Sequence, residues 1–153
     1  MNVQYINPFI KACSEVLMTI AALKLDIGKP YVKESPFSTD NLIIVIGITG
    51  EIRGQVVISM SEDVAKSLAS KMMMGMPVDE LNEMAKSALS ELGNMIMGNA
   101  ATVLFNDGIN VDITPPSMFM GQNLSMTSGE MKTVAIPLNN ELGLITLDIS
   151  IKE

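Results

Sequence analysis

An acid and an amide stand at helical spacing near the middle of the chain. Ser87, Glu91 and Asn94 occupy positions i, i+4 and i+7 of a segment with helical periodicity, so on a helix they share one face, away from the apolar stripe. A carboxylate and a carboxamide on the exposed side of a rigid helix can reach into the active site of another protein. The same residues are also typical of an ordinary solvated helix face, and the residues alone leave that alternative open.

The composition excludes most of the chemistry that the chain could perform alone. It has no histidine and a single cysteine, so a zinc site and a Ser-His or Cys-His catalytic pair are excluded. A glycine-rich phosphate loop is also absent from the sequence. A paired-carboxylate hydrolase or a hard-metal site stays open, although acidic residues in a first helical turn are ordinary. The acidic residues concerned are Asp79, Glu80, Glu83 and Glu91. We predict that the chain has no metal site of its own.

The charge balance argues against a nucleic-acid partner. The chain has 17 acidic and 10 basic residues, a net charge of −7, and no run of lysine or arginine, whereas phosphate backbones bind to clustered cations. Cys13 is alone and cannot form an internal disulfide, which suits a reducing compartment. No segment reaches the ~18 apolar residues that a membrane span requires. We therefore expect a cytoplasmic protein that binds no nucleic acid and does not insert into membranes.

The segment that carries the acid and the amide is predicted to be one long helix. Pro77 and Asp79 open it, its apolar periodicity continues to about residue 105, and Asn106-Asp107-Gly108 ends it. Gly93 lies inside this helix. Glycine costs up to about 1 kcal/mol in a helix interior relative to alanine, and it often marks the close approach of another backbone.

Two further helices and a set of strands are predicted around this helix. Asn7 caps a helix over residues 8–25 with Pro8 at its first position, and Ser61 caps another that continues to about residue 74. A polar loop is predicted between the first helix and the first long strand, over residues 35–40. Runs rich in β-branched residues are predicted to be strands at 31–34, 42–49, 55–60, 109–114, 131–138 and 142–151, with a further segment near 118–126.

This order of elements predicts an α+β fold. Residues 1–153 are expected to form one domain, in which a mainly antiparallel sheet packs with helices, one of them long and central. The last hairpin echoes the first, because residues 143–148 resemble residues 54–59. An internal pseudo-repeat of a helix plus a hairpin is therefore an interpretation that the sequence leaves open.

The residues around the acid and the amide resemble the CheX/CheC family of chemotaxis phosphatases. The run Glu91-Leu-Gly-Asn94-Met-Ile-Met-Gly98-Asn99-Ala100 carries the resemblance, together with Pro116, Gly121 and the opening Ile6-Asn7-Pro8-Phe9. The family signature is a Ser or Asp, a Glu four residues later, an Asn three further, and a downstream Pro. Ser87, Glu91, Asn94 and Pro116 fill those positions here. The signature occurs once, which favours the CheX type over the CheC type, whose members commonly carry two.

The resemblance implies a CheC-like fold and a specific enzyme activity. The substrate would be a CheY-like response regulator phosphorylated on aspartate, and that regulator would supply Mg²⁺, so the chain needs no cofactor of its own. Asn94 would orient the attacking water, and Glu91 would pair with a lysine of the regulator's active site. Ser87 would lie at the edge of the contact, and Pro116 would act as a structural support.

Two alternatives concern assembly. Proteins related to this family form parts of the flagellar switch, so a non-enzymatic adaptor or scaffold of the chemotaxis or flagellar-switch apparatus is the main rival to the phosphatase. The family also often pairs subunits through sheet edges, and the last strand ends at Lys152 and Glu153. A homodimer formed through that strand is a further expectation.

Overall fold

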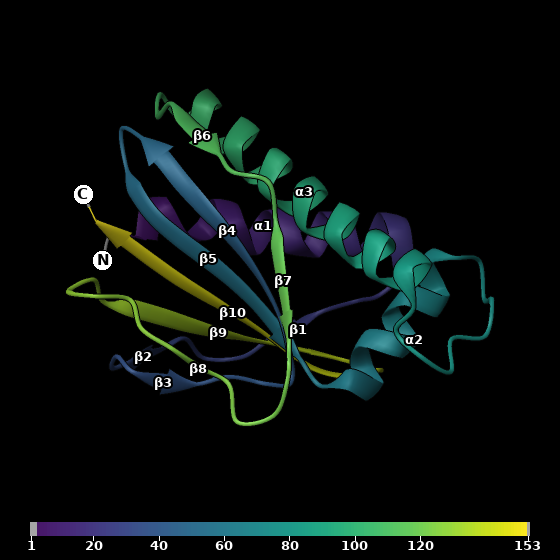
Figure 1. The fold of residues 1–153 in the computed structure, drawn as a ribbon. Coiled ribbons are helices and arrows are strands. Elements are labelled where there is room, and N and C mark those ends of the chain that lie inside the picture. Colours follow the sequence, from purple (N-terminus) through teal and green to yellow (C-terminus); the bar gives the residue numbers. More distant parts are fainter. Residues whose placement is uncertain (1–2, 153) are drawn as a thin grey trace.

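A computed structural model describes residues 3–152, which form three helices and ten strands (Figure 1). The helices are α1 (Val3–Ala21), α2 (Glu62–Met72) and α3 (Glu83–Asn106). The strands are β1 (Asp26–Ile27), β2 (Tyr31–Lys33), β3 (Phe37–Ser38), β4 (Leu42–Gly50), β5 (Arg53–Met60), β6 (Val111–Ile113), β7 (Ser117–Met120), β8 (Ser125–Met126), β9 (Thr133–Asn140) and β10 (Gly143–Lys152).

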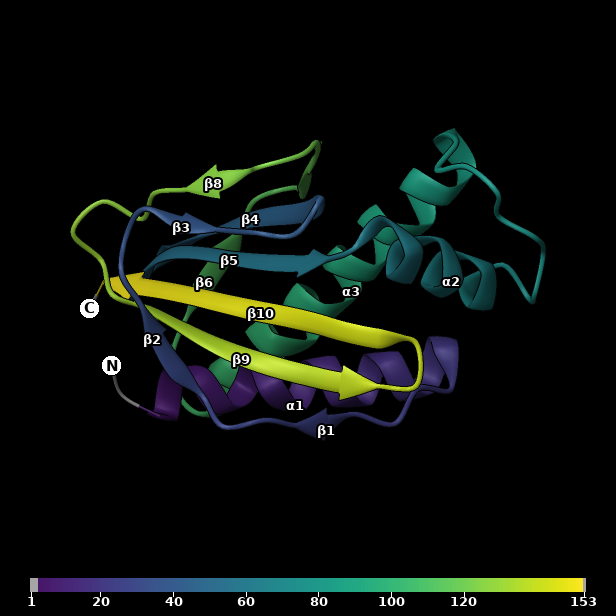
Figure 2. The same ribbon diagram turned by 90° about the horizontal axis from the view of Figure 1, so that it is seen from below.

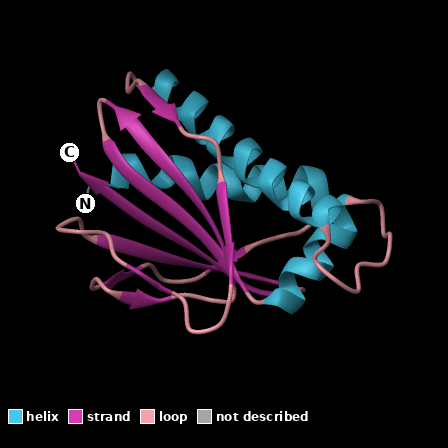
Figure 3. Ribbon diagram, viewed as in Figure 1, coloured by secondary structure: helices cyan, strands magenta, loops and turns pink. Residues whose placement is uncertain are grey.

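Helices and strands form separate layers, with α1 and α3 side by side on one face of an eight-stranded sheet (Figures 1 and 3). The strand order is β1-β9-β10-β5-β4-β6, β2 also pairs with β9, β7 also pairs with β4, and all these pairs are antiparallel. The short ribbon of β3 and β8 lies over the opposite face (Figure 2). The predicted α+β class, with a mainly antiparallel sheet and one long helix, is confirmed. The polar loop predicted over residues 35–40 is wrong in part, because it contains β3 and the buried side chain of Phe37.

The two halves of the chain share an order of elements. Each half runs from a long helix through short strands to a hairpin, β4–β5 in the first half and β9–β10 in the second. The second strands of the two hairpins, β5 and β10, pair with each other at the centre of the sheet. Gly54 and Gly143 lie at the starts of these strands, both with positive φ. The internal pseudo-repeat stays a prediction.

The first helix differs from the prediction at both ends. Among the described residues α1 begins at Val3, so the prediction that Asn7 caps it with Pro8 at its first position is wrong. The apolar stripe continues upstream of Pro8, since Ile6 is buried in the core, and this burial offsets part of the cost of a proline inside the helix. The helix ends at Ala21 because Ala22 adopts a positive φ of 51°, which turns the chain so that Leu23 is fully buried.

The only cysteine of the chain lies on α1, with its side chain in the hydrophobic core. Cys13 has no exposed surface, and burial raises the pKa of its thiol to about 12. Because the thiolate is the reactive form, we expect the native protein to resist iodoacetamide at neutral pH and to be alkylated at Cys13 once it is unfolded in urea. Mass spectrometry of the two samples checks this expectation. Alkylation of the native protein at the rate of the unfolded one would contradict it.

The last strand is not at an edge of the sheet. β10 lies between β9 and β5, and Lys152 is paired with Arg53. The expectation of a dimer formed through the last strand is therefore wrong in that detail, and Glu153 lies outside the described residues. The outer strands of the sheet are β1 and β2 on one side and β6 and β7 on the other. A homodimer through a sheet edge stays a prediction, and these are the edges that it would use.

The face of the sheet opposite the helices buries charged groups. The Asp148 side chain of β10 has no exposed surface, and its Oδ2 accepts a hydrogen bond from Lys33 Nζ at 3.0 Å. The same Nζ lies 5.0 Å from the centre of the Phe37 ring. Desolvation raises the pKa of Asp148, and the charge of Asp40 acts in the same direction, whereas Lys33 opposes the rise. This ion pair links β2 to the centre of the sheet.

Candidate functional site

The long helix that presents the site begins at a side-chain cap. Asn82 Oδ1 accepts a hydrogen bond from the backbone N–H of Ala85 at 2.9 Å, and α3 starts at Glu83. The prediction that Pro77 and Asp79 open this helix is therefore wrong. Asp79 and Glu80 precede α3, which separates these two acidic residues from Glu91. Within residues 3–152, no group of three or more His, Cys, Asp or Glu side chains is placed to hold a metal ion.

The three predicted site residues share one face of α3. Ser87, Glu91 and Asn94 are all exposed. Among residues 3–152 nothing hydrogen-bonds or forms an ion pair with their side chains, so they are available to a partner. The opposite face packs against the sheet and the other helices through Ala85, Leu89, Leu92, Gly93, Ile96, Met97, Ala100 and Leu104. The 3.6-residue period of the helix explains this separation.

Gly93 lets the packing face of α3 approach the sheet closely, directly before Asn94. A Cβ atom at Gly93 would lie 3.1 Å from Ile44 Cγ2 and 3.2 Å from Ile46 Cδ1, both on β4, and 3.7 Å from Pro116 Cβ. The sequence pattern indicated a close approach here, and the neighbours prove to be side chains of β4 and Pro116. A side chain at Gly93 would require these neighbours to shift by a few tenths of an ångström, so the glycine keeps the backbone that leads into Asn94 close to the sheet.

Pro116 lies in the bend between β6 and β7, beside Gly93. Thr114 ties this bend to β4, because its Oγ1 accepts a hydrogen bond from Gly47 N at 2.8 Å and its N–H donates to Gly47 O at 3.0 Å. The structure therefore brings Pro116 next to the residue that precedes Asn94. Its position suits a packing role, since proline has no side-chain group that reacts.

A groove between α1 and α3 adjoins the site and was not predicted. It has a volume of about 480 Å³ and is lined by Glu15, Val16, Met18, Thr19, Met95 and Asn99. Because Asn99 lies closer to the apolar stripe of the helix than Asn94 does, the sequence favours a buried, hydrogen-bonded amide at this position, and this expectation is wrong. Asn99 is half-buried, and residues 3–152 give its side chain no hydrogen bond. Met18 and Met95 leave exposed apolar side chains along this groove, an exposure that the sequence alone did not indicate.

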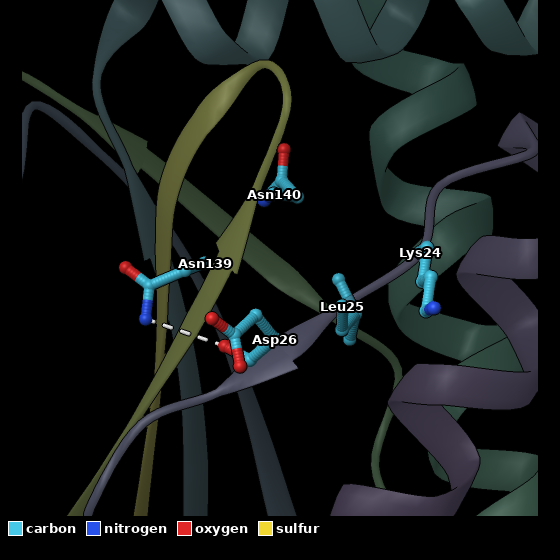
Figure 4. A pocket seen from close by; sticks show the side chains of 5 residues that line it. All are labelled: Lys24, Leu25, Asp26, Asn139 and Asn140. Atoms are coloured by element: carbon cyan, nitrogen blue, oxygen red, sulfur yellow. Dashed lines mark hydrogen bonds between the residues drawn. The ribbon is translucent and has the colours of Figure 1, made fainter.

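A second hollow lies where β1 pairs with the end of β9, and it has a structural explanation. It is lined by Lys24, Leu25, Asp26, Asn139 and Asn140 (Figure 4). Asn139 Nδ2 donates a hydrogen bond to the backbone carbonyl of Asp26 at 3.3 Å, which ties β9 to β1. The Asn139 side chain here therefore holds two strands together, whereas Ser87, Glu91 and Asn94 make no side-chain hydrogen bond or ion pair within residues 3–152.

Comparison with known proteins identifies the family. Residues 42–139 match the model of the family described as chemotaxis phosphatase CheX, and this range includes α3 and Pro116. The chain belongs to the CheX family. A relative described as the CheY-P phosphatase CheX of Thermotoga maritima is 37% identical over 128 residues, which cover 84% of this chain and 83% of the relative.

Solved structures share the whole fold. A CheC-like superfamily protein from Shewanella sp. PV-4 superposes with a TM-score of 0.91 at 26% identity and covers all of both chains. The CheX–CheY–BeF3–Mg²⁺ complex from Borrelia burgdorferi contains a chain with a TM-score of 0.84 at 29% identity, with 97% of this chain and 98% of that chain covered. The predicted CheC-like fold is thus confirmed. No helix within residues 3–152 is long and apolar enough to span a membrane.

Proposed function

We propose that the chain dephosphorylates a phosphorylated CheY-like response regulator by inserting Asn94 and Glu91 into the regulator's active site. The observation that carries this proposal is the pair of unpartnered polar side chains on the exposed face of α3, in a chain of the CheX family. The Thermotoga maritima relative is described as a CheY-P phosphatase. The Borrelia burgdorferi relative was solved bound to CheY with beryllium fluoride, which mimics a phosphoryl group.

The chemistry needs few groups from this chain. A water molecule attacks the phosphorus atom in line with the aspartyl oxygen, the P–O bond to that oxygen breaks, and the products are a free carboxylate and inorganic phosphate, which takes the proton from the water. Such transfers are catalysed mainly by positioning and charge stabilisation. The Asn94 carboxamide can accept a hydrogen bond from this water and donate one to a neighbouring oxygen, so it fixes the water without changing charge. Mg²⁺ held by the regulator would neutralise charge on the phosphoryl oxygens.

The remaining site residues position the helix. Glu91 lies one turn before Asn94, where its carboxylate would pair with the lysine of the regulator's active site and set the register of docking. Ser87 lies a further turn away and would contact the rim of that site. Pro116 supports the backbone at Gly93 through the packing described above. In this proposal Asn94 acts on the water, and the other site residues position the helix that carries Asn94.

Replacing Glu91 with alanine is expected to raise KM for the phosphorylated regulator about tenfold, a loss of about 1.4 kcal/mol of binding, with little change in kcat. The reason is that Glu91 contributes to docking and does not touch the water. Steady-state dephosphorylation rates over a range of regulator concentrations separate the two constants. Glu83→Ala is the matched control, because Glu83 carries the same charge on the same helix and its side chain is 95% exposed. An equal rise in KM for both variants would contradict a specific pairing by Glu91.

A further inference from the structure

Gly98 lies one turn beyond Asn94 on the same side of α3, and no contact within residues 3–152 accounts for a glycine there. A Cβ atom built on Gly98 would meet no heavy atom within 4 Å other than the neighbouring residues and backbone of its own helix. Its backbone is ordinary helix, so no positive φ requires glycine either. Glycine weakens a helix interior relative to alanine. Glycine at this position therefore lowers the stability of the helix, and no contact among the described residues requires it.

Every other glycine of the chain has a local explanation. Six adopt a positive φ, which other residues rarely tolerate: Gly50, Gly54, Gly75, Gly108, Gly129 and Gly143. The remaining four would place a Cβ within 3.3 Å of a neighbouring side chain: Gly28, Gly47, Gly93 and Gly121. Gly98 is thus the exception among the 11 glycines of the sequence, all of which lie in the described part.

A hinge in the helix does not explain Gly98. α3 is continuous from Glu83 to Asn106, with Gly98 well inside it. The carbonyl of Gly98 also accepts a hydrogen bond from Thr102 Oγ1 at 3.1 Å, a contact that ties this turn to the next one. The distinctive property of Gly98 is the open space above its Cα atom, on the face that carries Asn94.

We propose that the main chain of the response regulator crosses α3 at Gly98, and that the missing side chain provides the clearance for this contact. This inference rests on the proposed function. Four residues of helix place Gly98 about 6 Å from Asn94 along the axis. A standard protein interface covers about 800 Å² on each partner, which is about 32 Å across. A regulator whose active site surrounds Asn94 must therefore also cover Gly98, and glycine is typical where a backbone approaches closely.

The test fills this space in two steps, with Gly98→Ala and Gly98→Leu. Both residues favour helix more than glycine, so we expect the melting temperature to rise by about 2–4 °C. Gly98→Leu is expected to raise KM for the phosphorylated regulator by at least about tenfold, with kcat unchanged. Gly98→Ala should raise KM less. The dissociation constant of the regulator loaded with beryllium fluoride and Mg²⁺ should change in parallel, since it reports docking without catalysis.

Ser67→Leu is the matched control, because Ser67 is exposed on α2 and the change adds similar bulk to another helix surface. It should leave KM unchanged. If the wild type binds and dephosphorylates the regulator and Gly98→Leu does so with the same KM and dissociation constant, the proposed close contact at Gly98 is refuted while the proposed function stands. A lower melting temperature in both Gly98 variants would also refute it, because the fold itself would then need the glycine. If the wild type neither binds nor dephosphorylates any regulator, the proposed function fails and this inference fails with it.

Discussion

Asn94→Ala is expected to slow dephosphorylation of the regulator by about a hundredfold or more, because misplacing a reacting group by 1 Å already costs about that factor. The variant should fold as well as the wild type or slightly better, since Asn94 is exposed, the described residues give it no hydrogen bond, and alanine is the stronger helix former. The measurement is the rate of loss of phosphorylated regulator at saturating concentration, alongside thermal unfolding of both proteins.

Two further variants separate the role of the amide from general effects on the surface. Asn94→Asp keeps the shape but places a negative charge beside the phosphoryl group, so it should also be slow. Asn99→Ala changes another asparagine of α3, five residues later and in the groove beside α1, and should retain activity. Binding of the beryllium fluoride form should survive in Asn94→Ala. A large loss of stability in that variant would show that Asn94 is structural and would contradict its catalytic role.

Lys33→Met is expected to destabilise the fold by about 3 kcal/mol at neutral pH, the range found when one partner of a buried ion pair is removed. Lys33 is the hydrogen-bonding partner of the Asp148 carboxylate, which has no exposed surface. The other oxygen of that carboxylate, Oδ1, has no hydrogen-bond partner among the described residues. Methionine keeps the apolar stem of the lysine but leaves the buried charge without compensation. Urea unfolding followed by circular dichroism measures the difference.

The pH dependence of this loss has a definite sign. Desolvation already raises the pKa of Asp148 in the folded protein, and removing Lys33 removes the effect that opposes this rise. In the folded Lys33→Met variant the Asp148 carboxyl therefore binds its proton more tightly than it does in the unfolded chain. The protonated carboxyl contributes stability that is fully present below the pKa of the unfolded chain, about 3.9. That stability is lost as the pH rises through the raised pKa of the folded state. The deficit of Lys33→Met should consequently be largest at neutral pH and shrink on acidification.

Asp148→Asn in the Lys33→Met background supplies the control for this pair. It removes the buried negative charge, so the double variant should regain stability at neutral pH and lose the pH dependence of the single variant. Ordinary surface substitutions change the free energy of unfolding by no more than about 0.5 kcal/mol. If the free energy of unfolding of Lys33→Met lies within that range of the wild-type value at neutral pH, the account is contradicted. The kcat and KM for dephosphorylation should not change in the folded Lys33→Met variant, because Lys33 and Asp148 lie on the face of the sheet opposite α3.

The sequence was sufficient to predict the site face because that prediction depends only on helical geometry. Ser87, Glu91 and Asn94 are exposed together wherever the helix begins, provided that it is continuous through residues 87–94. The start of the helix was less predictable. Pro77 and Asp79 are typical residues for a helix start, yet the side chain of Asn82 forms the cap, since three residues compete with similar local preferences.

The features that were missed depend on contacts between distant parts of the chain. The alternation of β10 is typical of a strand with one solvated face, but Thr146, Asp148 and Ser150 are buried there. Lys33 is 115 residues from Asp148 in the sequence, so no local sequence pattern predicts this ion pair. The position of β10 at the centre of the sheet, which excludes it as a dimer edge, is likewise set by strand order.

The most direct test of the proposed function is a dephosphorylation time course. Response regulators from the same genome are phosphorylated with a small phosphodonor and Mg²⁺, the donor is removed, and loss of the phosphoryl group is followed with wild type, with Asn94→Ala and with no addition. We predict that the wild type accelerates the loss for at least one CheY-like regulator and that Asn94→Ala does not. Binding of the wild type to a regulator without any acceleration would contradict the phosphatase and favour the adaptor.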